Sequence, residues 1–151
     1  MQIKTVLKTL LIIHTALCAG LLLFAIFAYN MNRSFTAQMN QKDIFIYIVP
    51  IIAAGGYFLS QLVYKKRLLT ITQEEKLSIK LGKYQVAAIL KYAIIEAPGI
   101  LALLAYFWSG NALYLVIAIA LIIYLFAQRP TVDKIIKELP LTHEEQKTFS
   151  K

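Results

Sequence analysis

The fold is decided by long uncharged stretches, the first of which is residues 9–29, TLLIIHTALCAGLLLFAIFAY. A helix needs about 20 mostly apolar residues to cross a hydrocarbon core of about 30 Å, and this stretch has that length. Lys4 and Lys8 precede it, as they would in a signal peptide. However, the apolar run exceeds the roughly 7–15 residues of a signal core, and no small-x-small cleavage site follows Phe24. We therefore expect a retained transmembrane helix.

Three more stretches have the same character, at residues 44–64, 86–108 and 112–127. The last is the shortest, and the third is the only one with charges inside it, Lys91 and Glu96. Charged residues make up only 16% of the chain, against about 25% in typical soluble domains. The sequence thus predicts an all-α, polytopic membrane protein with four transmembrane helices in a single domain, 1–151, ending in an amphipathic cytoplasmic tail, 128–151.

The positive charges predict the orientation. Thirteen of the 16 Lys and Arg residues fall in the N-terminal segment, the connection between the second and third spans, and the C-terminal tail. Two fall in the first connection, none in the third, and Lys91 lies within a span. Because cytoplasmic segments are enriched in Lys and Arg, both termini are expected in the cytoplasm, at a cell inner membrane.

The net charge of +8 points to lipid as the partner. The basic residues lie beside the apolar stretches, where anionic headgroups attract them, and no nucleic-acid-binding motif is present. Lys91 is expected to extend its ammonium group to the same headgroups. The predicted headgroup contacts are Lys65, Lys66, Arg67, Lys80, Lys83 and Arg129.

Two cytoplasmic segments carry helix signals. Thr72 and Glu75, and again Thr142 and Glu145, have the T-x-x-E spacing of a capping box. The first predicts a helix that starts at Gln73 and continues into the third span. Pro130 should end the fourth helix, and a short amphipathic helix with Ile135, Ile136 and Leu139 on one side should follow it.

Glu96 is the most unusual residue, because a charge near the middle of a span is costly to insert. Pro98 lies two residues later and leaves the carbonyl of Ile94 without its helical hydrogen bond. This carbonyl and the carboxyl group of Glu96 together make a polar site at membrane depth. His14, at a similar depth in the first span, is a possible hydrogen-bond partner. These three residues are the predicted intramembrane polar site, either an ion or proton site or a neutral hydrogen-bonding group that specifies helix packing.

Small residues spaced four apart predict close helix contacts, with this chain or a second copy. Ala93 and Ala97 lie on roughly the same helix face as Glu96. We therefore expect this face to pack against protein. The predicted packing residues are Ala16, Gly20, Gly56, Ser60, Ala93 and Ala97.

Enzyme chemistry has no support in the sequence. The two histidines, His14 and His143, lie in different compartments, and no nucleophile motif, metal-ligand spacing or phosphate-binding glycine loop occurs. The single cysteine, Cys18, has no internal disulfide partner. We expect a protein that is not an enzyme and that binds neither a cofactor nor a metal.

The stretch LKYAIIEAPGI at residues 90–100, with Ser109-Gly110-Asn111 and Gln128-Arg129-Pro130-Thr131, resembles a family of small, uncharacterised four-span bacterial inner-membrane proteins. This resemblance implies a fold but no activity. A helix with one central acid is also similar to the proteolipid subunits of rotary ATPases, with Glu96 matching their ion-binding carboxylate. The chain departs from that pattern in its few glycines and its long basic segments.

Two functions follow from these features. The first is a non-enzymatic structural or accessory subunit that acts through helix packing and a basic cytoplasmic face, with a second copy or another membrane protein as its possible partner. The second is an oligomeric proton- or cation-conducting protein that uses Glu96.

Overall fold

The computed structural model describes residues 3–39 and 42–149, and the described part of the chain is all-α. Three helices are long and apolar enough to cross a membrane, and a fourth span is present if α4 and α5, bent by 79°, are taken together. The chain is therefore a multi-pass membrane protein, and the predicted fold class is confirmed. The helices are α1 (Ile3–Asn32), α2 (Phe45–Leu68), α3 (Leu77–Ser109), α4 (Ala112–Ala127), α5 (Val132–Glu138) and α6 (His143–Phe149).

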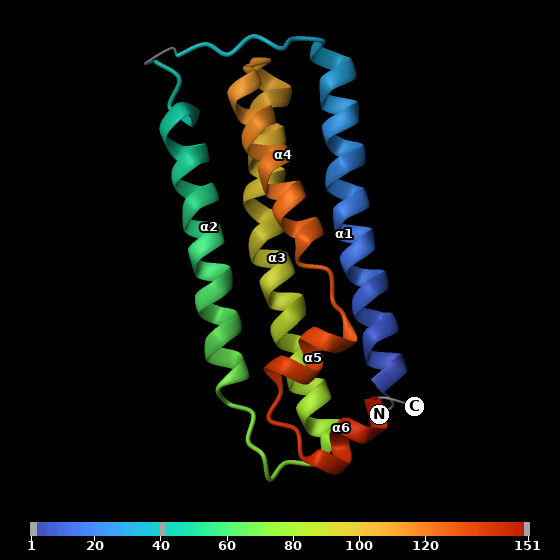
Figure 1. The fold of residues 1–151 in the computed structure, drawn as a ribbon. Coiled ribbons are helices and arrows are strands. Elements are labelled where there is room, and N and C mark those ends of the chain that lie inside the picture. Colours follow the sequence, from blue (N-terminus) through green and yellow to red (C-terminus); the bar gives the residue numbers. More distant parts are fainter. Residues whose placement is uncertain (1–2, 40–41, 150–151) are drawn as a thin grey trace.

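Helix α3 forms the centre of the bundle, with α1 and α2 on either side of it and α4 packed on its front (Figure 1). The start of α1 lies at the same end as α5 and α6, which we call the tail end. The opposite end, where α3 turns into α4 at Gly110, is the hairpin end. Ser150 and Lys151 of the predicted tail lie outside the described residues.

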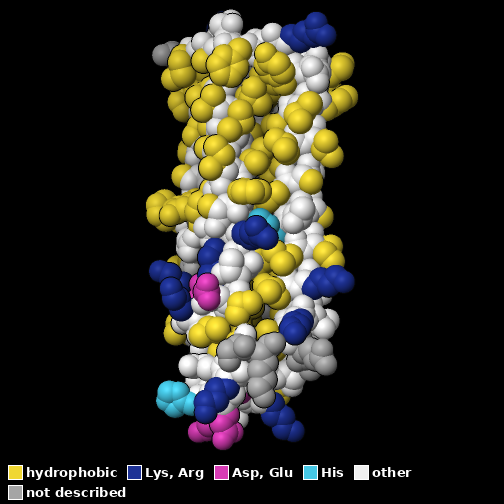
Figure 2. Space-filling model, turned by 45° about the vertical axis from the view of Figure 1, so that its right-hand side comes forward, with side chains coloured by type: hydrophobic (Ala, Val, Ile, Leu, Met, Phe, Trp, Pro, Cys, Tyr) yellow, Lys and Arg dark blue, Asp and Glu magenta, His cyan; other side chains and the backbone are white. Residues whose placement is uncertain are grey.

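The exposed surface of the bundle fits a lipid solvent. Large apolar side chains such as Leu23, Phe58, Ile123 and Phe126 are more than half exposed on three different helices. Figure 2 shows hydrophobic side chains covering the upper part of one face, with most of its Lys, Arg, Asp and Glu in the lower half. Soluble monomers rarely expose apolar patches of this extent, whereas hydrocarbon accepts them at no cost.

The four helices of the bundle differ markedly in length. Helix α3 has 33 residues and α1 has 30, so each is about 45–50 Å long and extends beyond the hydrocarbon core. Helix α4 has only 16 residues, which gives about 24 Å. It begins level with its neighbours at the hairpin end and therefore stops short of them at the tail end.

The closest helix contact is between α2 and α3. A Cβ atom at Gly56 would lie 2.5 Å from Cγ of Pro98 and 3.2 Å from the carbonyl oxygen of Ile94. That carbonyl is the one Pro98 leaves without its usual helical donor. Ser60, one turn further along α2, is also buried. Two of the predicted packing residues, Gly56 and Ser60, thus lie at this contact.

The other four predicted packing residues lie elsewhere. Ala16, Gly20, Ala93 and Ala97 are exposed, and no atom of the described residues lies within 4 Å of a Cβ built at Gly20. The expectation that the face of Glu96 packs against protein is therefore not met within this chain. The physical reason is that α1 and α2 contact α3 from either side and leave that part of α3 uncovered.

At the hairpin end, the connection after α1 is fixed to the top of α3 and α4. Asn111 caps α4 by accepting from the Leu113 amide at 3.1 Å, and its side-chain amide donates to the Gln38 carbonyl at 2.7 Å. Tyr114 donates to Asp43 at 2.5 Å. Gly110 adopts φ +67°, the left-handed conformation that ends α3.

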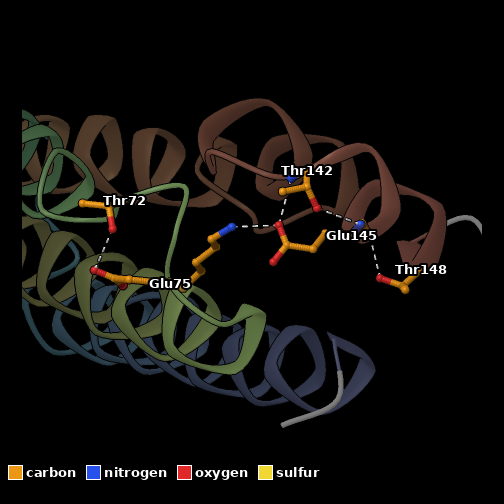
Figure 3. Close-up of polar contacts among 6 residues, drawn as sticks. Thr72, Glu75, Thr142, Glu145 and Thr148 are labelled. Carbon is orange, nitrogen blue, oxygen red and sulfur yellow. Dashed lines mark hydrogen bonds and ion pairs between the residues drawn. The ribbon is translucent and has the colours of Figure 1, made fainter.

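The two capping-box predictions had different outcomes. In α6 the Thr142 amide donates to Glu145 at 2.8 Å and the Glu145 amide donates to the Thr142 hydroxyl at 3.3 Å (Figure 3), so this box is confirmed. The box at Thr72 does not start a helix, because α3 begins only at Leu77. The carboxylate of Glu75 accepts from the Thr72 hydroxyl at 3.4 Å (Figure 3) and from Lys83 Nζ of α3 at 2.5 Å.

We expect the Gly56→Ala substitution to destabilise the protein, because its methyl group would overlap the Pro98 ring. Overpacking of this kind costs about 1–3 kcal/mol, more than the roughly 1 kcal/mol that alanine gains over glycine in a helix. Gly55→Ala is the matched control, since a Cβ there meets no described atom within 4 Å. Unfolding in mixed micelles should show a loss of stability for the first variant and none for the second. Equal stabilities would contradict this packing.

Candidate functional site

The early end of α4 places backbone carbonyls at membrane depth. The last four carbonyls of any helix have no partner within that helix, and hydrocarbon offers them none. Pro130 prevents continuation, because it lacks an amide and its ring would clash with the preceding turn. The backbone amides of Gln128 and Arg129 donate to the carbonyls of Leu125 and Phe126 at 3.0 and 3.2 Å. Side chains from the other helices supply the further hydrogen bonds at this helix end.

His14 on α1 bonds one of them. Its Nε2 lies 2.8 Å from the Leu125 carbonyl oxygen, and because a carbonyl only accepts, Nε2 carries the proton. The imidazole is buried and meets the edge of the Tyr92 ring at a centroid distance of 5.1 Å. The possible hydrogen bond between His14 and Glu96 is thus not formed, and His14 bonds a backbone carbonyl of α4 instead.

Tyr92 and Lys134 bond further carbonyls at this helix end. The Tyr92 hydroxyl donates to the Gln128 carbonyl at 3.3 Å. Lys134 on α5 donates to the carbonyls of Ala127 and Arg129 at 3.3 and 3.0 Å. Helices α1, α3 and α5 therefore each contribute a side chain to the end of α4.

Lys91 lies beside this helix end and is buried, with only 8% of its surface exposed. Its Nζ donates to Oε1 of Gln128 at 2.6 Å and lies 4.4 Å from the centroid of the Tyr64 ring. The prediction that Lys91 extends to the headgroups is wrong. The chain after α4 covers the path that its side chain would take.

Glu138 supplies the negative charge of this region. It accepts hydrogen bonds from the hydroxyls of Tyr64, at 2.5 Å, and Tyr84, at 3.1 Å. A cavity of about 30 Å³ lies among these groups, which is room for a water molecule. We call the set the tail-end cluster; its members are Tyr64, Tyr84, Lys91, Tyr92, Gln128, Lys134 and Glu138.

The tail-end cluster fastens α5 across the ends of α2 and α3. It has two lysines and one carboxylate, held by three tyrosines and an amide. Within residues 3–39 and 42–149, no three His, Cys, Asp or Glu side chains are grouped so as to hold a metal ion. The cluster therefore acts as a structural clamp. Its hydrogen bonds hold α5 and the segment after α4 against α2 and α3.

Glu96 lies apart from the tail-end cluster. It is half-buried, and no hydrogen bond or ion pair links it to the described part of the chain. Pro98, the third member of the predicted polar site, packs on Gly56 instead. The structure therefore does not bring the three predicted residues together: His14 bonds α4, Pro98 packs on α2, and Glu96 has no hydrogen-bonding partner among the described residues.

The predicted headgroup residues fall into two groups. Four of them, Lys65, Lys66, Arg67 and Arg129, are exposed near the tail end. Lys80 is fully buried and forms an ion pair with Glu145 at 2.7 Å, because α6 covers this side of α3. Lys83 is paired with Glu75 and is only partly free to reach a lipid.

Sequence reasoning missed the tail-end cluster. One signal was available: Lys91 and Gln128 are polar residues in or next to a span, and a lysine inside a span requires either lipid or a partner. The tyrosine donors gave no signal, because Tyr64 and Tyr84 suit the membrane interface equally well.

No protein-family model, curated protein or solved structure matches this chain.

We expect Glu138→Gln to loosen α5. The amide keeps the shape of the side chain but weakens two charge-assisted hydrogen bonds and leaves Lys91 and Lys134 without the carboxylate. Stability should fall by about 1–3 kcal/mol in mixed-micelle unfolding. Glu74→Gln, which neutralises an exposed carboxylate, is the control. A clamp role is contradicted if both variants are equally stable.

The Lys80–Glu145 ion pair predicts a pH-dependent release of α6. Burial acts to raise the pKa of Glu145, but hydrogen bonds from Lys80 and from the Thr142 amide outweigh it and hold the pKa below its usual value. A lowered carboxyl pKa stabilises the folded state above the unfolded pKa of about 4.3, and this stabilisation is lost as pH falls through the folded pKa.

A spin label on Gln146→Cys, in a Cys18→Ser background, should therefore become more mobile as the pH falls from 6 to 3. Glu145→Gln should be mobile at both values, and Glu144→Gln should respond like the parent. A label whose mobility does not change with pH in the parent protein would refute the linkage.

Proposed function

We propose that this protein is a non-enzymatic subunit of the cytoplasmic membrane that associates with a second copy of itself through the exposed seam between α1 and α3. The observation that carries this proposal is Glu96. Acids within membrane spans nearly always face a partner or a polar cavity. Glu96 has no hydrogen-bonding partner among the described residues of its own chain, so the partner is expected to come from another molecule.

The position of Glu96 on the seam follows from one aromatic contact. Phe27 of α1 and Phe107 of α3 stack with their ring centroids 6.0 Å apart. Ala16 and Glu96 each precede the stacked phenylalanine of their helix by 11 residues. Eleven residues are about three helical turns, so both residues lie on the same side as the stacked rings and at about the same depth.

The surroundings of Glu96 favour a close approach by another helix. Ala16 and Gly20 on α1, and Ala93 and Ala97 on α3, are all exposed and small. Small residues let helix backbones come close together, which is the main source of helix affinity in lipid. We define the seam by these four residues together with Glu96.

A second copy suits this seam because a protonated carboxyl group both donates and accepts a hydrogen bond. Two copies related by a two-fold axis along the membrane normal would bring Glu96 to Glu96 at equal depth. Such an interface uses the same patch on both partners, as two-fold dimers do. The exposed cations Lys65, Lys66 and Arg67 would then give the dimer a basic face at the tail end, towards the cytoplasm.

Proton or cation conduction remains the second candidate, and it also depends on Glu96. Conduction requires that the acid exchange its proton or ion along a polar path, whereas assembly requires only that it hydrogen-bond. Glu96→Gln separates these requirements, since glutamine keeps both donor and acceptor but cannot titrate.

The test is the oligomeric state in lipid bilayers. Ala97→Cys, in a Cys18→Ser background, should form a disulfide-linked dimer on oxidation, whereas Leu59→Cys, exposed on α2, should not. Glu96→Gln should still dimerise, and Glu96→Leu and Ala97→Phe should shift the equilibrium to monomer. The proposal fails if the parent protein stays monomeric as the protein-to-lipid ratio rises, or if Glu96→Leu dimerises normally. Loss of proton flux from liposomes in Glu96→Gln would favour conduction instead.

A further inference from the structure

The short α4 also leaves a groove beside α1. The groove has a volume of about 670 Å³, within the usual range for small-molecule sites. His14, Ala16 and Cys18 of α1 line it. The residues that form its walls are Leu11, Ile12, Thr15, Ala19, Phe126 and Arg129.

The walls are mostly apolar, and their one charged residue is Arg129. Arg129 is exposed, and its guanidinium group has no hydrogen bond or ion pair with the described part of the chain. Lys8 precedes Ile12 by one turn, so it lies on the same face of α1 and is exposed as well. Among the described residues, no Asp or Glu lines the groove.

The depth of Lys8 corresponds to lipid headgroups. Lys8 precedes Tyr29 by 21 residues, a distance of about 31 Å along α1. If Tyr29 lies at one membrane interface, as tyrosines at helix ends do, Lys8 lies at the other, since the hydrocarbon core is about 30 Å thick. The groove then extends from this second interface into the acyl-chain region.

We propose that the groove binds one anionic phospholipid. Arg129 and Lys8 contact its phosphate group, and one acyl chain lies along Leu11, Thr15 and Ala19 against Phe126. The excess of positive charge favours a headgroup with net negative charge, such as phosphatidylglycerol, over a zwitterionic one, whose amine would be repelled. This site does not depend on the proposed dimer, because Glu96 does not line the groove, which shares only Ala16 with the seam.

Native mass spectrometry of the purified protein tests the charge requirement. After delipidation, phosphatidylglycerol should bind more tightly than phosphatidylcholine. Arg129→Gln and Lys8→Gln should each weaken phosphatidylglycerol binding by about fivefold, the effect of one cation near a lipid surface. Lys65→Gln makes the same change in net charge on α2 and should have no such effect. Equal binding of both lipids, or an equal loss in Lys65→Gln, would refute a specific site.

A second variant tests the groove itself. Ala19→Phe should fill the acyl channel and reduce phosphatidylglycerol binding while all charges remain. Ala54→Phe, at an exposed position on α2, should bind like the parent. Thermal unfolding establishes that each variant is folded. Normal binding by Ala19→Phe, or displacement of the lipid by inorganic phosphate, would show that the acyl chain has no site here. Binding should persist in monomeric Glu96→Leu, which separates this test from that of the dimer.

Discussion

The structure depends on one constraint: a helix that ends within a membrane must find hydrogen-bond donors for its last carbonyls. Helix α4 ends after 16 residues. The amides of Gln128 and Arg129 close its last turn, and His14, Tyr92 and Lys134, on three other segments, donate to carbonyls at or just after its end. Each donor fixes one segment relative to α4. The position of α1, the burial of Tyr92 and the fold-back of α5 are therefore consequences of one short helix.

The sequence predicts the helices well because hydrophobic length is a local property. The stretch 112–127 coincides with α4, and the apolar pattern of Ile135 and Leu139 correctly predicts α5 and its buried side. It does not predict where α5 docks, since this depends on contacts such as Tyr64 with Glu138, 74 residues apart. Lys91 shows the same limit, because whether a lysine extends to lipid or is covered by protein is decided by another segment.

The small residues and the intramembrane polar residues show a different limit of sequence reasoning. Spacing identifies Gly56 and Ala97 equally as possible contact residues, yet one lies against Pro98 and the other faces outward. In the same way, His14 and Glu96 are both polar groups at membrane depth, but within the described part of the chain only His14 has a partner. A membrane helix has no polar face to mark its exterior, so the pattern alone does not distinguish contacts within the chain from contacts between molecules.

The break after α4 has opposite effects on its two sides. On the side towards α2 and α3, the chain turns by 79° and brings Gln128, Lys134 and Glu138 beside Lys91, which is buried among these polar groups. On the side towards α1, the missing turn leaves a hollow with apolar walls and, at its rim, a guanidinium group unpaired among the described residues. A longer α4 would place side chains in that hollow and would carry Gln128 away from Lys91. The same shortening therefore creates an internal clamp that needs no further ligand, and beside it a surface that lipid completes.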